Sequence, residues 1–164
     1  MSEPGEPGVA APLRWLDRTL PGVEANLALD EALLVAAEEQ GAGSVVRLWE
    51  LPGLAVVLGA SCRRAEAVRL ELCRAEGVPV ARRSSGGGTV LLGPGALNVA
   101  VVLPRDAAPG LGAVDVAQHF VLERIAAAVR ALGPSVEVLG SGDLTLRRRK
   151  VAGSAQRRLR RHFL

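Results

Sequence analysis

The chain has 164 residues, the length of one domain, and 49% of them are hydrophobic, which allows a real core and excludes general disorder. Its apolar runs are far too short to span a bilayer, and its N-terminus lacks the basic-then-apolar order of a signal peptide, so we predict a cytoplasmic protein without membrane segments. The net charge of +3 is unevenly distributed, because eight basic residues and no acidic residue follow Asp143. Such a segment typically meets an anionic partner.

Patterns of apolar and turn-forming residues predict short strands between three helices. In chain order we expect a flexible tail over 1–12, a strand over 13–17, a helix over 22–40, strands over 45–50 and 54–58 joined by a tight turn, a helix over 65–76, strands over 78–82, 89–92 and 97–103, a helix over 114–132, and strands near 136–139, 143–146 and 150–155. Tight turns and hairpins outnumber regular βαβ alternation. The predicted fold class is therefore α+β, with a mixed, largely antiparallel sheet packed with helices.

The helices carry apolar faces at helical spacing. In the first, the inward face is predicted to hold Ala25, Leu29, Leu33 and Ala36, and the outward stripe Glu24, Glu31 and Glu38. Asn26 and Asp30 lie on the inward arc, where we expect hydrogen bonds to a neighbouring loop, because unpaired burial costs about 1–3 kcal/mol per group. The shorter helix over 65–76 is predicted to turn Leu72 inward. In the last helix we expect His119 outside and an inward face of Val114, Ala117, Val121, Ile125, Ala128 and Leu132.

Three consecutive glycines, Gly86 to Gly88, directly follow Arg82-Arg83-Ser84-Ser85. Glycine loses more backbone freedom on folding than any other residue, so this run indicates either a flexible hairpin loop or a ligand that approaches the backbone closely. Two guanidinium groups beside exposed backbone N–H groups suit a phosphate or carboxylate. The spacing is neither that of a Walker loop nor that of a dinucleotide fingerprint. The motif thus indicates an anionic ligand of open identity.

The chain has one lysine, Lys150, among 19 arginines. Either an arginine-rich composition left one lysine by chance, or Lys150 occupies a place where a planar, permanently charged guanidinium would fail. Gly153 and Ser154 follow it and permit a close backbone approach. The basic segment could also bind RNA, but two Trp, two Phe and no Tyr provide few of the stacking side chains typical of single-strand binders. Nucleic acid is therefore disfavoured as a partner.

Taken together, these segments resemble the lipoate–protein ligase A family of the biotin/lipoate ligase superfamily. The resemblance rests on residues 80–90 (VARRSSGGGTV), on Asp143-Leu144 and on residues 149–156 (RKVAGSAQ), with further agreement at 26–33 and 46–49. It runs from about Leu13 to Leu164 and implies a ligase-like catalytic domain. The family pattern continues further, so the resemblance implies that residues 13–164 are the N-terminal part of that domain, in a fragment or a shortened relative.

The resemblance implies ATP-dependent activation of lipoate to lipoyl-adenylate, with Mg²⁺ accompanying ATP, and transfer to a lysine of a lipoyl-domain acceptor protein. It implies that Lys150 is the catalytic residue, stabilising charge between the acyl carbonyl and the α-phosphate. An apolar tunnel would hold the carbon chain of lipoate or octanoate. No metal site of the protein's own is expected. The residues implied to bind nucleotide and substrate are Arg83, Gly87, Gly88, Thr89, Val90, Leu91 and Asp143.

A further departure and several alternatives accompany this interpretation. Gly142 stands where many ligases have Asn, so a polar contact near the nucleotide or metal is expected to be missing. Related octanoyltransferases act without ATP through a cysteine shortly before the lysine motif, but residues 138–149 contain none. Cys62 and Cys73 are expected to be structural. The alternatives to a ligase are an octanoyl or lipoyl acyltransferase of the same superfamily, an inactive binding relative and, from a different class, an RNA-binding module with an arginine-rich tail.

Overall fold

The computed structural model describes residues 12–63, 68–140 and 142–164. The elements in chain order are β1 (Arg14–Asp17), α1 (Val23–Gln40), β2 (Val45–Trp49), β3 (Ala55–Leu58), α3 (Leu70–Ala75), β4 (Val80–Arg82), β5 (Val90–Leu92), β6 (Asn98–Pro104), α4 (Val114–Ala131), β7 (Val136–Leu139), β8 (Asp143–Leu146), β9 (Arg149–Gly153) and β10 (His162–Phe163). The tail predicted over 1–12 lies outside the described residues except for Pro12, as do residues 65–67 of the predicted helix 65–76. None of the described helices is long and apolar enough to cross a membrane.

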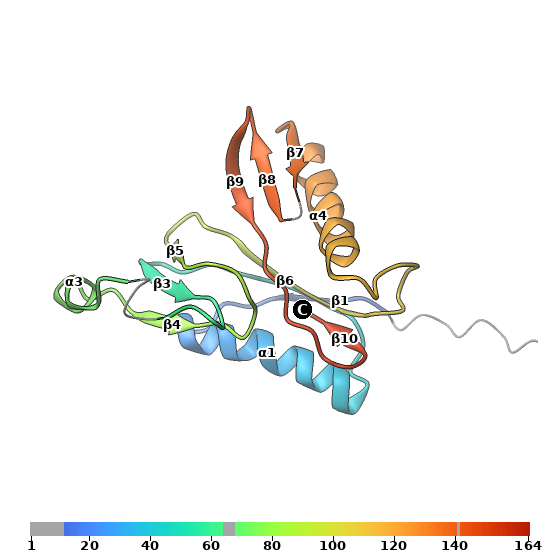
Figure 1. The fold of residues 1–164 in the computed structure, drawn as a ribbon, viewed down its shortest axis with the longest axis horizontal. Coiled ribbons are helices and arrows are strands. Elements are labelled where there is room, and N and C mark those ends of the chain that lie inside the picture. The colour runs from blue at the N-terminus through green and yellow to red at the C-terminus, as the bar shows by residue number, and fades with distance from the viewer. Residues whose placement is uncertain (1–11, 64–67, 141) are drawn as a thin grey trace, which may run out of the picture.

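The strands form three small sheets, in the orders β1-β2-β6-β10, β4-β3-β5 and β7-β8-β9. The β1–β2 and β3–β4 pairs are parallel, and the other pairs are antiparallel. This pairing confirms the α+β class with a mixed, largely antiparallel arrangement. In Figure 1, α1 lies along the first two sheets and α4 lies beside the third. The turn at Pro52-Gly53 leads from one sheet into the next, so β2 and β3 form no hairpin.

Each sheet packs on its own group of apolar side chains. The helix α1 contributes Leu34 and Ala37 to a cluster with Val45 of β2 and Val102 of β6. A second cluster joins β3 and β4 with Trp49 and Leu51. The helix α4 packs against β7 and β8 through Leu122, Ala126, Val136 and Leu144. The glycine-rich segment and the lysine-bearing hairpin therefore extend from different cores.

The buried face of α1 lies one residue later than predicted. Its buried residues are Val23, Asn26, Asp30, Leu34 and Ala37, whereas the predicted inward residues Ala25, Leu29, Leu33 and Ala36 are only half-buried. The displacement has a polar cause, because Arg47 of β2 is completely buried under the helix. Its guanidinium draws the amide and carboxylate of α1 toward the core.

The Arg47 guanidinium is fully occupied by hydrogen bonds. It donates to Asp30 Oδ1 and Asn26 Oδ1, both at 2.5 Å, and to the backbone carbonyls of Asn26 at 2.9 Å and Arg18 at 2.8 Å. Trp49 Nε1 donates to Asp30 Oδ2 at 3.0 Å. Burial raises the pKa of Asp30, while the hydrogen bonds from Arg47 and Trp49 lower it. The predicted tie to a neighbouring loop is confirmed by Asn26 Nδ2, which donates to the Leu20 carbonyl at 2.7 Å.

The predicted inward faces of the other two helices are partly wrong. In α4 the buried residues are Ala117, Leu122 and Ala126, while Val114 and Leu132 are 52% and 85% exposed. The β7–β8 pair covers the side of the helix that carries Leu122 and Ala126, so the predicted stripe is only partly covered. In α3, Leu72 is 52% exposed. His119 is exposed, as predicted.

The short strand β10 has no counterpart among the predicted elements. It pairs with β6, with Phe163 opposite Leu103, and Glu38 of α1 holds it from the other side. The Glu38 carboxylate accepts hydrogen bonds from the backbone N–H groups of Arg161 and His162, each at 3.0 Å, and lies 3.0 Å from His162 Nδ1. Glu38 is therefore half-buried and paired, not a solvated member of the outer glutamate stripe.

This anchor makes a prediction about acid stability. Burial raises the pKa of Glu38, but the hydrogen bonds from His162 and from the backbone of Arg161 and His162 outweigh it, and the net pKa lies below its ordinary value of 4.5. A depressed carboxyl pKa contributes stability that is present above the unfolded value and is lost as the pH falls through the folded value. When the pH is lowered from about 6 to about 3, we expect the free energy of unfolding to fall more in the parent protein than in the Glu38→Gln variant. Urea denaturation at each pH measures this difference. Parallel losses in the two proteins would contradict the anchor.

Candidate active site

The glycine loop, residues 84–88 between β4 and β5, is held by the side chain of Arg83, which directly precedes it. Its Nη2 donates to the carbonyls of Gly86 at 2.6 Å and Gly88 at 2.9 Å, and Nη1 lies 3.5 Å from the Val57 carbonyl. Burial lowers the pKa of Arg83 from its ordinary value, and the neighbouring Cys62 raises it in part. The loop thus has a defined conformation, whereas one of the two interpretations of the sequence is a flexible hairpin loop.

A second arginine shapes the opposite segment. Arg82 Nη1 donates to the carbonyls of Gly59, Ala60 and Cys62 at 2.7, 3.0 and 2.8 Å. In this structure both guanidinium groups of the Arg82-Arg83 pair bind backbone carbonyls. The anion contact that the sequence predicts would therefore come from groups of the two loops that these arginines hold in place.

Gly59 is a structural residue of the site that the sequence analysis missed. A Cβ placed there would lie 1.9 Å from the Gly87 carbonyl oxygen, a distance at which backbone must move. Cys62, which is expected from the sequence to be structural, also lies here, with its Sγ 3.4 Å from the same Gly87 oxygen. Gly59 directly follows a buried strand, which is the only sequence signal that would have drawn attention to it.

Gly59→Ala is expected to destabilise the glycine loop. Overpacking of this kind typically costs about 1–3 kcal/mol, and the displaced neighbour is backbone, which has little room to yield. The measurement is the free energy of unfolding by urea. Gly53→Ala is the matched control, because a Cβ at Gly53 meets nothing within 4 Å. Equal stability of the two variants would show that the loop does not rest on Gly59.

The lysine motif lies on the β8–β9 hairpin. Lys150 Nζ forms an ion pair with Asp143 Oδ1 at 2.7 Å, and the two side chains are 59% and 38% exposed. A Cβ at Gly153 would lie 3.0 Å from both Cε and Nζ of Lys150. The Lys150 side chain therefore lies along β9 and passes over Gly153, which has no side chain. The structure brings together two of the three charged residues that the sequence analysis selected, Lys150 and Asp143, while the third, Arg83, lies at the glycine loop.

The base of this hairpin is tied to α4. Gln118 Nε2 donates to Ser154 Oγ at 2.7 Å, and Ser154 donates to the Gly142 carbonyl from its backbone N–H at 2.7 Å and from Oγ at 3.0 Å. A Cβ at Gly142 would lie 2.9 Å from Gln118 Nε2. The space of a side chain at position 142 is thus occupied by the Gln118 amide, which the sequence analysis did not select.

The glycine loop and the lysine hairpin meet just after β9. The Gly86 N–H donates to the Gln156 carbonyl at 3.3 Å, and a Cβ at Gly87 would lie 4.0 Å from the Ala155 Cβ. Lys150 itself pairs with Asp143 and not with the loop. The Lys150 ammonium, the Asp143 carboxylate and the backbone of the glycine loop therefore lie around one region. The β7-β8-β9 sheet contributes the two charged groups, and the β4-β3-β5 sheet contributes the loop.

Unused polar and apolar groups surround that region. Among the residues that the structure describes, Arg83 Nε and Thr89 Oγ1 are buried without a hydrogen-bond partner, and a Cβ at Gly88 meets nothing within 4 Å. Val90 and Leu91, on the edge strand β5, are 44% and 63% exposed. Such a site can take a ligand that combines an anionic group with an apolar chain.

Comparison with known proteins identifies the class of this domain. Residues 23–164 match the family model of the lipoyl protein ligase A/B catalytic domain. The chain therefore belongs to this family, which confirms the resemblance in the sequence.

The sequence is similar to those of two curated proteins of different activity. A protein from Aeropyrum pernix with the provisional name lipoate-protein ligase A is 40% identical over 130 residues, which are 79% of this chain and 47% of that protein. An octanoyl-[GcvH]:protein N-octanoyltransferase from Geobacillus kaustophilus is 31% identical over 145 residues, which are 82% of this chain and 50% of that protein. The chain thus spans about half the length of these relatives.

Solved structures share the fold. The structure of a bi-partite lipoate protein ligase with its E2 lipoyl domain from Thermoplasma acidophilum matches with a TM-score of 0.82 and 25% identity, over 92% of this chain and 58% of that chain. A lipoate-protein ligase A bound with ATP matches with a TM-score of 0.79 and 23% identity, over 92% of this chain and 63% of that chain. The second match supports the fold alone.

Proposed function

We propose that this domain activates lipoate with ATP and transfers the lipoyl group to a lysine of a lipoyl-domain protein. The observation that carries the proposal is the meeting of the glycine loop with the Lys150–Asp143 hairpin, where Gly86 binds the Gln156 carbonyl. Family membership and the provisional ligase name of the Aeropyrum pernix relative support it.

In the first step a lipoate carboxylate oxygen attacks the α-phosphorus of ATP. A P–O bond forms, the bond to the bridging oxygen of the β-phosphate breaks, and pyrophosphate leaves. Lys150 would leave Asp143 for the carboxylate and α-phosphate oxygens, where negative charge develops. Its compact ammonium suits a contact that must form and break.

In the second step the neutral amine of an acceptor lysine attacks the acyl carbonyl. The C–N bond forms, the C–O bond to AMP breaks, and the proton of the amine passes to solvent. Backbone N–H groups of the segment Gly87–Thr89, which precedes the paired strand β5, and Thr89 Oγ1, which has no partner among the described residues, are the groups proposed to bind the adenylate. Exposed Val90 and Leu91 would contact the apolar chain.

Asp143 fits the Mg²⁺ that accompanies ATP. This ion commonly binds through one or two carboxylates together with phosphate oxygens, and no three His, Cys, Asp or Glu residues gather anywhere in the described part of the chain. Bound there, Mg²⁺ would neutralise phosphate charge. Asp143 would hold it only together with ATP, because a single carboxylate makes no site of its own.

The test is calorimetric titration with a non-hydrolysable lipoyl-adenylate analogue and, separately, with single-stranded RNA. We expect the analogue to bind and the RNA to bind far more weakly. Gly88→Val is expected to weaken analogue binding by about 10-fold or more while preserving the melting temperature, because its side chain would fill the open space over the loop. Salt-sensitive RNA binding without any response to the analogue would overturn the proposal, and normal analogue binding by Gly88→Val would remove the loop from it.

A second candidate is ATP-independent octanoyl transfer. The Geobacillus kaustophilus relative favours it, and so does the position of the Cys62 Sγ at 3.4 Å from the Gly87 carbonyl oxygen. In that reaction the Cys62 thiolate would attack the acyl thioester of a carrier, and the carrier's thiol would leave. The neutral amine of an acceptor lysine would then attack the Cys62 thioester, so that an amide bond forms, the C–S bond breaks and the Cys62 thiol is released. Cys62→Ser separates the candidates, because a ligase retains ATP-dependent transfer whereas a transferase loses transfer altogether.

A further inference from the structure

The β8–β9 hairpin closes through two arginines in an unfavourable backbone conformation. Arg147 and Arg148 have φ values of 49° and 63°, and no other described residue apart from glycine has a positive φ. Leu146 pairs with Arg149, so these two residues form the whole turn. A two-residue turn with positive φ at both positions strongly favours Asn-Gly. Strained backbone conformations of this kind cluster at functional sites.

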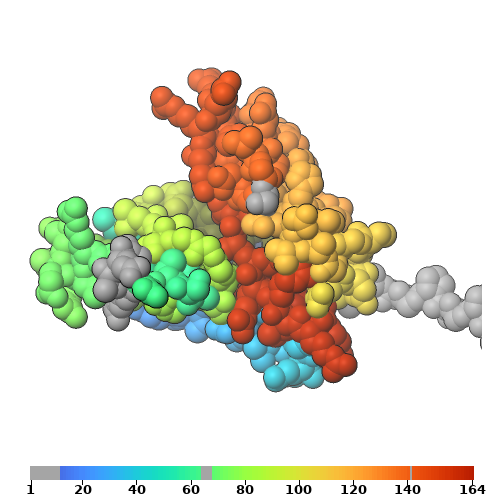
Figure 2. Space-filling model, in the orientation of Figure 1, coloured from blue at the N-terminus to red at the C-terminus, as the bar shows by residue number. Residues whose placement is uncertain are grey.

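The turn presents cationic charge without internal neutralisation. Arg147, Arg148 and Arg149 are all exposed, and their side chains form no ion pair or hydrogen bond with the residues that the structure describes. In Figure 1 the closed end of this hairpin points away from the β1-β2-β6-β10 sheet, and Figure 2 shows this end of the molecule protruding from the surface. The arginines therefore add nothing to the fold that an Asn-Gly turn would not provide.

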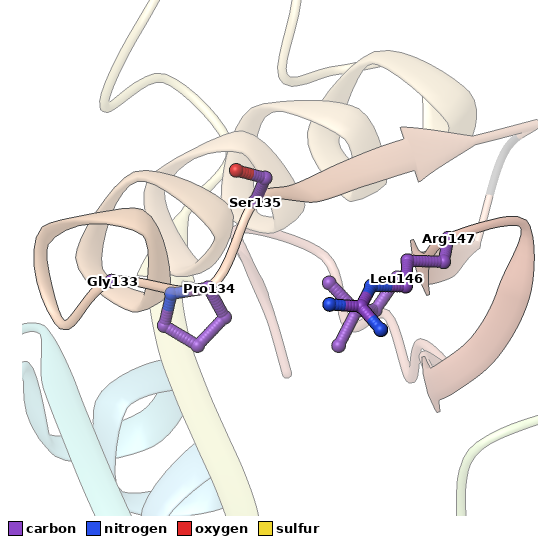
Figure 3. Close-up of a pocket in the computed structure, with 5 residues that line it drawn as sticks. All are labelled: Gly133, Pro134, Ser135, Leu146 and Arg147. Carbon is purple, nitrogen blue, oxygen red and sulfur yellow. The ribbon is translucent and has the colours of Figure 1, made fainter.

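An open groove lies beside the turn. It is lined by Gly133, Pro134, Ser135, Leu146 and Arg147. Figure 3 shows the Arg147 side chain extending toward the Pro134 side of this groove. Leu132, next to the groove at the end of α4, is 85% exposed. The surface thus combines several positive charges with apolar contact area, a combination typical of protein-docking surfaces.

We propose that this arginine turn, with its groove, docks an acidic protein domain, the acceptor of the proposed acyl transfer. The inference rests on the proposed function, because the same hairpin carries Lys150. From Arg148 to Gly153, where the Lys150 ammonium lies, the strand covers five residues, or about 16 Å at 3.3 Å per residue. Only a macromolecule can contact the turn and offer a lysine at that distance. Complementary charge would speed its association and orient it.

A protein fits this surface better than RNA. Single-stranded nucleic acid is held by phosphate contacts together with base stacking on aromatic side chains. Residues 121–162 contain no Phe, Trp or Tyr, and Phe163 is buried. The groove offers leucine and proline instead, which suit an apolar side chain of a folded partner.

The experiment measures binding of an unmodified lipoyl domain with an acidic surface to the full chain, at low and at high salt. The test variant is Arg147→Asn/Arg148→Gly, which removes two charges and introduces the turn sequence that this geometry favours, so its melting temperature should not fall. The control is Arg14→Gln/Arg69→Gln, which removes the same charge from exposed positions elsewhere. We expect the test variant to bind roughly 10-fold more weakly at low salt, and the control to bind like the parent.

A second pair of variants examines the groove. Leu132→Ser should weaken binding at both salt concentrations, whereas Leu72→Ser, an exposed leucine on α3, should leave it unchanged. Equal binding by the parent and the Asn-Gly variant, or loss of RNA binding in that variant without any lipoyl-domain binding, would overturn the docking proposal. Titration with the adenylate analogue is run in parallel. Analogue binding together with lipoyl-domain binding that does not depend on the turn refutes docking alone, whereas turn-dependent docking without analogue binding refutes only the proposed chemistry.

Discussion

Lys150→Arg is expected to lose as much activity as Lys150→Ala, about 10²–10³-fold in adenylate formation, the size typical of one contact to developing charge. The position of the Lys150 side chain is the physical reason for expecting that retained charge is not sufficient. The Lys150 side chain lies over Gly153, with Cε and Nζ each 3.0 Å from where a Cβ would stand, and it ends 2.7 Å from Asp143. A planar guanidinium is wider and has its donors fixed in a plane. Arginine would keep the pair with Asp143 and fail to follow the reacting oxygens.

The measurement is ATP- and lipoate-dependent release of pyrophosphate, followed together with modification of a lipoyl domain. Arg157→Ala is the control, because Arg157 is exposed and its charge belongs to a solvated run. Arg148→Ala should also leave pyrophosphate release unchanged, since its proposed role concerns only the acceptor. A Lys150→Arg variant as active as the parent would mean that the single lysine is an accident of composition.

Arg47→Met is expected to cost about 3–5 kcal/mol of unfolding free energy, the usual effect of removing one partner from a buried ion pair. Arg47 is completely buried, and its loss would leave the Asp30 carboxylate and the Asn26 side chain without their main donor. Burial already raises the pKa of Asp30, and the opposing contributions of Arg47 would vanish. A carboxyl with a raised folded pKa loses stability as the pH rises above its unfolded value, so the deficit should be larger at neutral pH than at acidic pH.

Urea denaturation of the whole chain measures this effect. Arg74→Met is a matched control, because the Arg74–Glu71 pair has the same 2.5 Å separation but lies on the surface, with side chains 70% and 87% exposed. Exposed pairs contribute about 0–1 kcal/mol. If both variants lost similar stability, the buried cluster around Arg47 would not be the structural centre of the α1–β2 contact.

Local patterns predicted most elements because apolar spacing and turn residues act over a few positions. The helix α1, the β8–β9 hairpin and the end of α3 before Gly77 all follow from such signals. The face of α1 could not be predicted in the same way. Arg47 is 17 residues from Asp30 in sequence, and nothing local indicates that an arginine will be buried under the helix. The two-residue strand β10 depends on pairing with β6 and on Glu38, both distant in sequence.

The site shows the same division. Lys150 and Asp143 could be selected because both belong to one recognisable motif. On the adjacent strands Asp143 lies opposite Gly153 and Lys150 opposite Thr145, and the two side chains meet across this register. Gly59, Cys62 and Gln118 reach the site from other segments, and each acts through a contact that only the tertiary structure creates. The roles of Arg83 and Arg82 as donors to backbone carbonyls also depend on how two loops meet. The functional role of each selected residue stays a prediction for the experiments above.

The link between Glu38 and β10 also bears on the order in which the chain folds. Its partners are separated by 123 and 124 residues, and the sheet that it closes also draws strands from residues 14–17, 45–49 and 98–104. On a ribosome that sheet must wait for residue 163. The unit from α4 to β9, by contrast, is built from neighbouring segments between residues 114 and 153 and has its own apolar cluster. Because local contacts form faster than distant ones, the lysine-bearing unit should fold first and the sheet under α1 last.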